Sequence, residues 1–207
     1  MGPRPVVLTV SCPRFEVQKD HYTGYNVWGA GISEVEVDIL TGQMFVVRAD
    51  LLEDAGLSTS PIVDIGQVEG AFIMGLGLFT SEEIKHDMNT GELLTKNTWE
   101  YKPPAAKDIP QDFRVTLLKN ARNPMGVMSS KGNREFLIFS SMLMFCLLSA
   151  TGEPGMLMSI GVLFAIRDAV NSAREDSGLT GWWQLNAPAT VEAIQQHAGL
   201  RPELFIF

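Results

Sequence analysis

A single carboxylate, Glu153, is the residue best placed to do chemistry. It lies in the segment Thr151-Gly152-Glu153-Pro154-Gly155, between apolar segments and just before a predicted helix. Partial desolvation there would raise the pKa of the carboxyl group toward the range of a general base, whereas the positive end of the helix dipole would lower it. The residues alone leave two interpretations open: a catalytic base, or an ordinary acidic residue in the first turn of a helix.

Other familiar catalytic and binding motifs are missing from the sequence. Gly70 and Gly75 have the spacing of a phosphate-binding loop, but no Lys-Ser/Thr pair follows them. No GxSxG motif of a serine hydrolase occurs, and Gly75-Leu76-Gly77 is only weakly similar to a dinucleotide-binding turn. The two cysteines and three histidines show no metal-ligand spacing. We therefore expect no metal ligands from this chain.

Two neighbouring segments with β-branched residues predict a β-hairpin. Within Ile32–Leu40, apolar residues alternate with acidic ones from Val35 onward. Thr41-Gly42 is a plausible tight turn, and Gln43–Leu52 is again rich in valine and phenylalanine. Alternation with a period of two places one apolar row on one face of a sheet, which favours two antiparallel strands.

A long glycine-containing helix is predicted from about Ile65 to Ile84, with Asp64 as its N-terminal cap. The glycines within this pattern are Gly66, Gly70, Gly75 and Gly77. Each glycine costs about 0.5–1 kcal/mol relative to alanine in a helix interior. Their number indicates the close approach of another backbone or a bulky ligand, and tight helix packing is the alternative.

The rest of the chain adds turns, strands and helices. The sequence predicts a turn at Asn89–Gly91, strands at Leu93–Tyr101 and Phe113–Leu118, an extended loop at Tyr101–Pro110, a helix at Met156–Ala173 and a final short helix starting at Pro188. Strands and helices do not alternate strictly. We therefore expect an α+β (mixed α/β) fold, with a β-hairpin, a long glycine-rich helix and C-terminal helices.

The composition limits the partners and the compartment. The 207 residues are 45% hydrophobic and 19% charged, and the formal net charge is −8 at pH 7. An acidic chain repels nucleic-acid phosphates and anionic membrane surfaces, so we expect neither partner. Three prolines bracket the short apolar run Val6–Val10, which makes it a poor signal peptide. We expect a cytoplasmic protein.

The longest apolar stretch, Phe136–Ala150, has 15 residues without a charge. A membrane-spanning helix needs about 20 apolar residues. A buried helix is therefore the favoured interpretation, and a membrane segment is the alternative.

Five ordered motifs resemble the C-terminal part of the xanthine dehydrogenase/aldehyde oxidase family. They are GAGISEVEVDILTGQ (29–43), VDIGQVEGAFIMGLGLFTSEE (63–83), YKPPAAKDIPQDFRVTLLKNARNP (101–124), SSK with TGEP (129–131 and 151–154), and GVLFAIRDAV with NAPATVEAI (161–170 and 186–194). The methionine of AFIMGLG and the C-terminal tail are most similar to aldehyde oxidases of the insect type.

The resemblance implies a molybdenum hydroxylase that oxidises aldehydes or N-heterocycles with oxygen derived from water. It implies that Glu153, the glutamate of GEP, is the general base, and that Gln67, the glutamine of GQVEG, hydrogen-bonds the pterin of a Mo-molybdopterin cofactor. Two [2Fe-2S] clusters and FAD would belong to upstream domains that this chain does not contain. A homodimer is expected for the full-length family enzyme.

One block interrupts the resemblance immediately before Glu153. The family pattern continues from Lys131 to Ala150 when residues 132–149, 18 in all, are removed. The amino acids at both edges of the block allow codons with splice signals, so we expect an insertion or a retained intron. The predicted division is a non-family lead-in at 1–24 and a partial molybdopterin-binding domain at 25–207. The alternatives are an inactive, truncated or mis-spliced remnant and a small membrane-associated protein.

Overall fold

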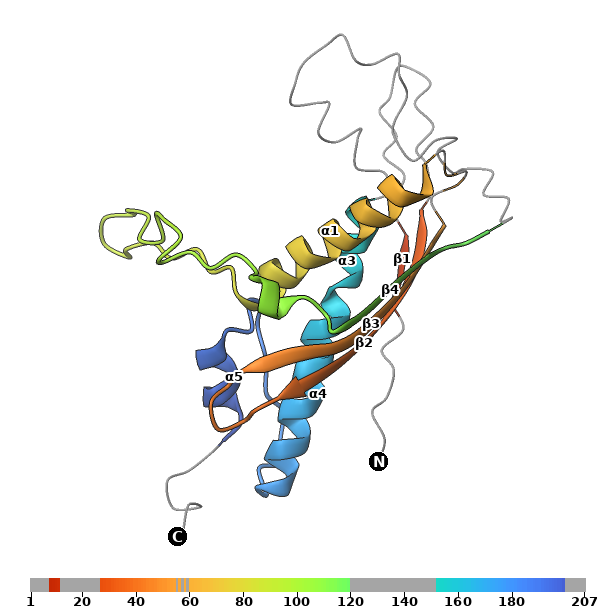
Figure 1. Cartoon of the computed structure of the whole chain (residues 1–207). Helices are drawn as coiled ribbons and strands as arrows, with labels where there is room; N and C mark the ends of the chain where they lie inside the picture. Colours follow the sequence, from red (N-terminus) through yellow and green to blue (C-terminus); the bar gives the residue numbers. More distant parts are fainter. Residues whose placement is uncertain are drawn as a thin grey trace, which may run out of the picture.

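In the computed structural model the described residues are 8–11, 27–54, 56, 58, 60–119 and 152–199, with the backbone alone at 8–11 and at Glu153. The apolar stretch Phe136–Ala150 and the block 132–149 both lie outside the described residues. Strands and helices combine in a sheet with helices packed on one of its faces (Figure 1). The expected α+β class is confirmed.

The sheet has four strands in the order of the sequence: β1 (Leu8–Ser11), β2 (Trp28–Val37), β3 (Met44–Asp54) and β4 (Asp112–Leu117). The first three strands are antiparallel neighbours, whereas β4 lies parallel to β3. A parallel return requires a crossover connection, and here it contains the long helix α1. The lead-in that we expected to be loose contributes β1, whose Leu8 lies opposite Gly31 of β2.

The predicted hairpin is confirmed as β2 and β3, although β2 begins at Trp28, before the expected start. Asp38 organises the turn, because its carboxylate accepts hydrogen bonds from Leu40 N (2.9 Å) and Thr41 Oγ1 (2.8 Å). Gly42 has a φ of +75°, a left-handed conformation that favours glycine. The expected turn at Thr41-Gly42 is therefore confirmed.

Helix α1 (Pro61–Thr80) is the predicted glycine-rich helix, shifted toward the N-terminus. The prediction that Asp64 caps it is wrong, because Ser60 occupies the cap position and Pro61 begins the helix. Proline fits the first helical position, since its φ is fixed at a helical value and no hydrogen bond of its nitrogen is lost. Asp64 is instead buried in the first turn, where its Oδ2 accepts a hydrogen bond from Ser58 Oγ.

The segment after α1 contains the expected turn at Asn89–Gly91 but not the expected strand at Leu93–Tyr101. Only a single bridge, between His86 and Leu93, forms there, and Figure 1 shows this segment as an arm that extends away from the sheet. A strand needs a neighbour along its length, and among the described residues the two sides of the arm pair only at Lys85–Asp87 and Glu92–Leu94. The loop at Tyr101–Pro110 contains a short 3-10 helix, Ala106–Asp108.

The C-terminal region forms three helices: α3 (Gly152–Met158), α4 (Ile160–Asp176) and α5 (Val191–His197). The prediction of one helix at Met156–Ala173 is wrong in two respects. The helical segment begins at Gly152, and it breaks at Ser159, whose Oγ donates to the Met156 carbonyl oxygen at 2.6 Å. The final helix begins after Thr190 rather than at Pro188, because Thr190 Oγ1 accepts from Ala193 N and caps it.

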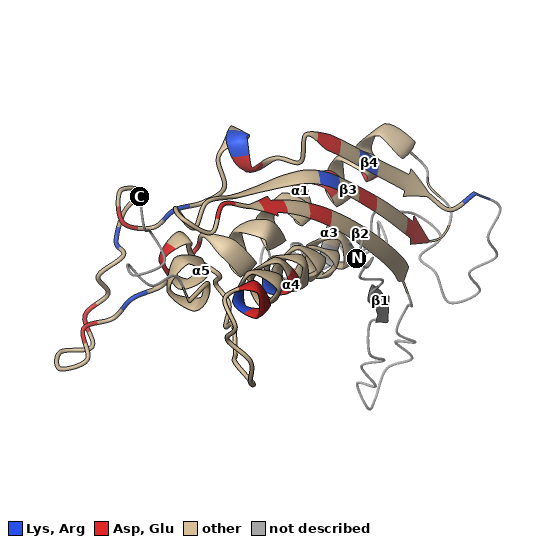
Figure 2. Cartoon of the chain, turned by 90° about the horizontal axis from the view of Figure 1, so that it is seen from below, with Lys and Arg blue, Asp and Glu red and all other residues tan. Residues whose placement is uncertain are grey.

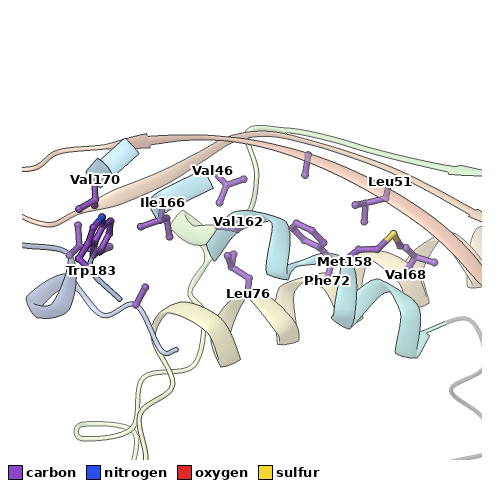
Figure 3. Packing of buried hydrophobic residues seen from close by; sticks show 13 residues of the cluster. Val46, Leu51, Val68, Phe72, Leu76, Met158, Val162, Ile166, Val170 and Trp183 are labelled. Atoms are coloured by element: carbon purple, nitrogen blue, oxygen red, sulfur yellow. The ribbon is translucent and has the colours of Figure 1, made fainter. Parts of the chain in front are cut away.

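The hydrophobic core lies between the sheet and the helices, as Figure 3 shows. Its largest contributors from α1 are Phe72 and Leu76, and the Phe72 ring lies 5.2 Å from that of Phe113 on β4. Two helical segments, Pro61–Thr80 and Pro154–Asp176, have the length and hydropathy of a membrane span, with 33% of each apolar window buried. Both pack against the sheet, which is also the behaviour of core helices in a globular domain.

The opposite face of the sheet carries charged residues (Figure 2). Arg48 lies next to Asp50 on β3 and 3.9 Å from Asp112 on β4, and Arg114 contacts the same Asp112 at 2.6 Å. These ion pairs are largely exposed, so each adds little stability. They nevertheless make this part of the sheet compatible with water.

Candidate cofactor and catalytic site

Helices α1 and α3 cross at very short distance, and glycines make this possible (Figure 1). A Cβ atom on Gly75 would overlap Ser159 Oγ and the Met156 carbonyl oxygen. On the α3 side, a Cβ on Gly155 would lie 2.8 Å from the carbonyl oxygen of Val68. At this crossing the glycines serve tight helix packing, the alternative that the sequence analysis left open.

The crossing brings the two predicted site segments together. Gln67 lies on the exposed side of α1, and its Oε1 is 3.8 Å from the position of a Cβ on Gly152. Gly152 is the first residue of α3 and directly precedes Glu153, so the two motifs meet although 85 residues separate Gln67 from Glu153. The Glu153 backbone lies in the first turn of α3 rather than in a loop before a helix. Its side chain lies outside the described part of the structure.

Space is open on the same side of α1 as Gln67. Among the described residues, no atom beyond the helix's own backbone lies within 4 Å of the Cβ position of Gly66 or of Gly70. The amide of Gln67 can both donate and accept hydrogen bonds, which suits the edge of a pterin ring. This part of the chain therefore fits one wall of a cofactor site. Within the described ranges, no group of three or more His, Cys, Asp or Glu residues is arranged to hold a metal ion.

Glu53 is a buried carboxylate near the N-terminal end of α1 that the sequence analysis did not predict. Glu53 continues the inward-facing row of Ala49 and Leu51 on β3, and its side chain is 0% exposed. In the part of the chain that the structure describes, neither of its carboxylate oxygens has a hydrogen-bond partner, and the same is true of Asp64 Oδ1. The period-two pattern of β3 could have revealed it, because it places Glu53 on the same face as Leu51.

The environment of Glu53 determines its protonation. Burial raises the pKa of Glu53 to about 8, and the neighbouring carboxylates of Asp64 and Asp54 add to the shift. Desolvation and like charges both disfavour the ionised form of an acid. At neutral pH, Glu53 is therefore mainly protonated, and it is a hydrogen-bond donor rather than a negative charge.

One cavity of the structure lies away from this surface. It has a volume of about 440 Å³ and lies near the C-terminal end of α1, where Thr80, Lys85, Lys102 and Glu192 are among its lining residues. Neither Gln67 nor Gly152 lines it. The candidate site is thus an open surface around Gln67, not this cavity.

Comparisons with known proteins agree with the motifs. Residues 8–110 match the model of the family "Molybdopterin cofactor-binding domain". The chain is 42% identical over 181 residues to xanthine dehydrogenase/oxidase of Gallus gallus, covering 87% of this chain and 12% of that protein. It is 44% identical over 171 residues to aldehyde oxidase 4 of Mus musculus, covering 83% of this chain and 11% of that protein. The likeness to insect-type enzymes stays a prediction.

Solved structures show the same fold. Quinoline 2-oxidoreductase from Pseudomonas putida 86 superposes with a TM-score of 0.64 at 22% identity, over 86% of this chain and 19% of that chain. Aldehyde oxidoreductase from Desulfovibrio gigas gives a TM-score of 0.53 at 19% identity, over 84% and 16%. The chain spans only about 12% of the length of the xanthine dehydrogenase that it matches. With its motifs, its fold and its relatives in agreement, the chain belongs to the xanthine dehydrogenase/aldehyde oxidase family of molybdenum enzymes.

Proposed function

We propose that this chain forms one wall of the Mo-molybdopterin site of an aldehyde- or N-heterocycle-oxidising hydroxylase. Gln67 binds the pterin, and Glu153 is the general base. The observation that carries the proposal is the meeting of the two motifs, with Gln67 Oε1 3.8 Å from the Cβ position of Gly152. Such a meeting is expected when both residues serve one ligand, and it does not follow from their distance in the sequence.

The position of Glu153 in the first turn of α3 suits a base that must stay ionised. Partial positive charge at a helix N-terminus stabilises a carboxylate. Gly155, two residues after Glu153, lets α3 lie close to α1, because a Cβ atom there would be 2.8 Å from the Val68 carbonyl oxygen, so the Glu153 backbone is held by a tight helix crossing. When bound, the cofactor supplies the two-electron oxidation and the oxygen atom derived from water. The contribution of Glu153 is to accept a proton during hydroxylation.

The remaining parts of the enzyme come from outside this sequence. Two [2Fe-2S] clusters and FAD would carry the electrons away in upstream domains, and the full-length enzyme would be a cytoplasmic homodimer. Membership of the family supports this part of the proposal, because the relatives of the chain are far longer than the chain itself.

A chimera tests the proposal. The segment of the Gallus gallus enzyme that aligns with this chain is replaced by the chain's own sequence without residues 132–149. We expect the chimera to retain molybdenum and to oxidise aldehydes or heterocycles. Glu153→Gln should lower kcat by about 10²–10⁴-fold and leave the molybdenum content unchanged. Gln67→Ala should lower the molybdenum content instead.

A matched control separates these roles from general effects of mutation. Glu192→Gln removes an exposed carboxylate on α5, which lies outside the candidate site. It should change neither kcat nor molybdenum content. An active Glu153→Gln chimera would rule out the proposed base.

The alternative, an inactive remnant, is favoured by one observation, the 18-residue block at 132–149 that directly precedes the GEP motif. A second chimera that keeps the block distinguishes the two. If the chimera without the block is active and the one with it is not, the sequence as given encodes a remnant of a working site. If a uniform cDNA carries the block and the genomic DNA lacks splice signals at its edges, a retained intron is excluded.

A further inference from the structure

Helix α1 has an exposed apolar ridge along one side. The ridge consists of residues at every fourth position: Ile62, Gly66, Gly70, Met74 and Leu78. Ile62 is 87% exposed, Met74 62% and Leu78 50%, and both glycines are exposed. Residues four apart form a continuous row on a helix surface. The ridge is therefore one apolar strip along the full length of α1.

The two glycines make the ridge a place where another backbone can approach closely. In the part of the chain that the structure describes, nothing outside the helix's own backbone lies within 4 Å of the Cβ position of either Gly66 or Gly70. On the other side of the same helix, Gly75 is in contact with α3 and admits its backbone. Small residues spaced by four along a helix let a second helix come near enough for extensive van der Waals contact.

From this geometry we infer that the ridge is the docking surface for an apolar helix from the part of the molybdopterin-binding domain that lies outside this sequence. The chain covers only 11–12% of its relatives, so most of what borders it in a complete enzyme comes from other sequence. The inference about the ridge depends only on the family assignment and not on the roles proposed for Glu153 and Gln67.

The charges of α1 favour a protein partner over a lipid surface. The helix contains no lysine or arginine, and its acidic residues are Asp64 and Glu69. Helices that lie on membranes usually place basic residues beside the apolar face, where they meet anionic headgroups. The charged sheet face differs from the ridge as well, because its ion pairs suit it to water.

Methionine oxidation gives a direct test, because the chain supplies its own reference residues. Met74 reports on the ridge, Met88 is 96% exposed and reports on free solvent, and Met158 is 1% exposed and reports on the core. In the chain alone, hydrogen peroxide should oxidise Met74 at a rate near that of Met88. In the block-deleted chimera, Met74 should react at least about tenfold more slowly and resemble Met158. Because oxidation is counted instead of turnover, an inactive chimera still reports on the ridge.

Three outcomes would overturn the inference. Equal oxidation of Met74 in the chain and in the chimera would show that no upstream helix covers the ridge. Protection of Met74 in the chain alone as its concentration rises would assign the ridge to a second copy. Protection on adding phosphatidylcholine vesicles would assign it to a lipid surface.

Bulky substitutions give a second, independent readout. Gly70→Leu meets open space in the chain alone and should leave its melting temperature within about 2 °C, whereas in the chimera it should lower the melting temperature by about 5 °C or more. Asp168→Leu adds the same side chain to an exposed position of α4 and should have no such differential effect. Equal effects of Gly70→Leu in both proteins would contradict the inference.

Discussion

The two halves of α1 use glycine in opposite ways. In the C-terminal half, the backbone of α3 occupies the space beside Gly75, and Pro104 occupies the space beside Gly77. The neighbouring Phe72 and Leu76 are fully buried. In the N-terminal half, no described residue occupies the positions beside Gly66 and Gly70. The same half lies next to buried carboxylate oxygens without a hydrogen-bond partner among the described residues, namely both oxygens of Glu53 and Oδ1 of Asp64.

The difference shows where the contacts of α1 are closed within the described structure and where space and polar atoms remain available to other groups. A closed contact leaves neither free space nor unsatisfied polar atoms. Around Gly75, α1 meets both conditions against α3. In the N-terminal half, Val68 packs against Gly155 of α3, but the positions beside Gly66 and Gly70 are open among the described residues. The N-terminal half also contains Gln67 and faces the start of α3, so open space and buried carboxylate oxygens without a hydrogen-bond partner among the described residues occur in the same half of the helix.

The largest effect that would test this comparison is expected at Gly75. Gly75→Leu places a side chain where Ser159 Oγ and the Met156 carbonyl oxygen already lie, so α3 must move away from α1. Overpacking of this kind should lower the free energy of unfolding by more than about 3 kcal/mol. Urea unfolding followed by circular dichroism measures it.

The matched control for that change is Gly70→Leu, which adds the same side chain to the same helix. Because its Cβ position is open, it should leave the free energy of unfolding of the isolated chain unchanged or slightly higher. Equal destabilisation by the two substitutions would mean that the halves of α1 do not differ as described.

Sequence reasoning found the elements better than their ends. The β2–β3 hairpin was predictable because alternation reports directly on a half-buried strand. The start of α1 was misplaced because a proline can begin a helix as well as end one. The break at Ser159 was missed, because it depends on a hydrogen bond to Met156 that periodicity does not encode.

The candidate site was predictable only through the family motifs. Nothing in residue spacing indicates that Gln67 and Gly152 come together, since their proximity results from how α1 and α3 cross. The glycine pattern left tight helix packing open as an alternative, and such packing is found at Gly75, but the same pattern could not show that Gly66 and Gly70 stay open among the described residues. The sequence specifies that these positions are glycines, whereas tertiary packing determines which atoms lie next to each of them.

The next largest effect concerns Glu53 and pH. Its pKa is about 8 in the folded chain against an ordinary value of 4.5, so the folded state keeps a proton that the unfolded chain loses. The free energy of unfolding should therefore fall as the pH rises from about 4.5 to about 8, by up to about 1.4 kcal/mol per pH unit. Below that window, both states are protonated and the contribution is constant.

Glu53→Gln isolates this contribution from those of other titrating groups. The variant carries no charge at any pH, so the difference in free energy of unfolding between it and the parent should grow between pH 5 and pH 8 in favour of the variant. Urea titrations at pH 5, 6, 7 and 8 measure the difference. A difference that stays constant across this range would mean that Glu53 is not buried in its protonated form, and that the open half of α1 contains no unpartnered acid.

The smallest expected effect comes from alanine at the open glycines. Gly66→Ala and Gly70→Ala add a methyl group to space that is empty in the isolated chain, so helix propensity alone decides the result. Each should raise the free energy of unfolding by about 0.5–1 kcal/mol. Gly75→Ala is the control on the closed half, where the same methyl group overlaps α3 and must destabilise. Stabilisation by alanine at both open positions, together with destabilisation at Gly75, would show that the glycines of α1 differ in their surroundings rather than in their own helix propensity.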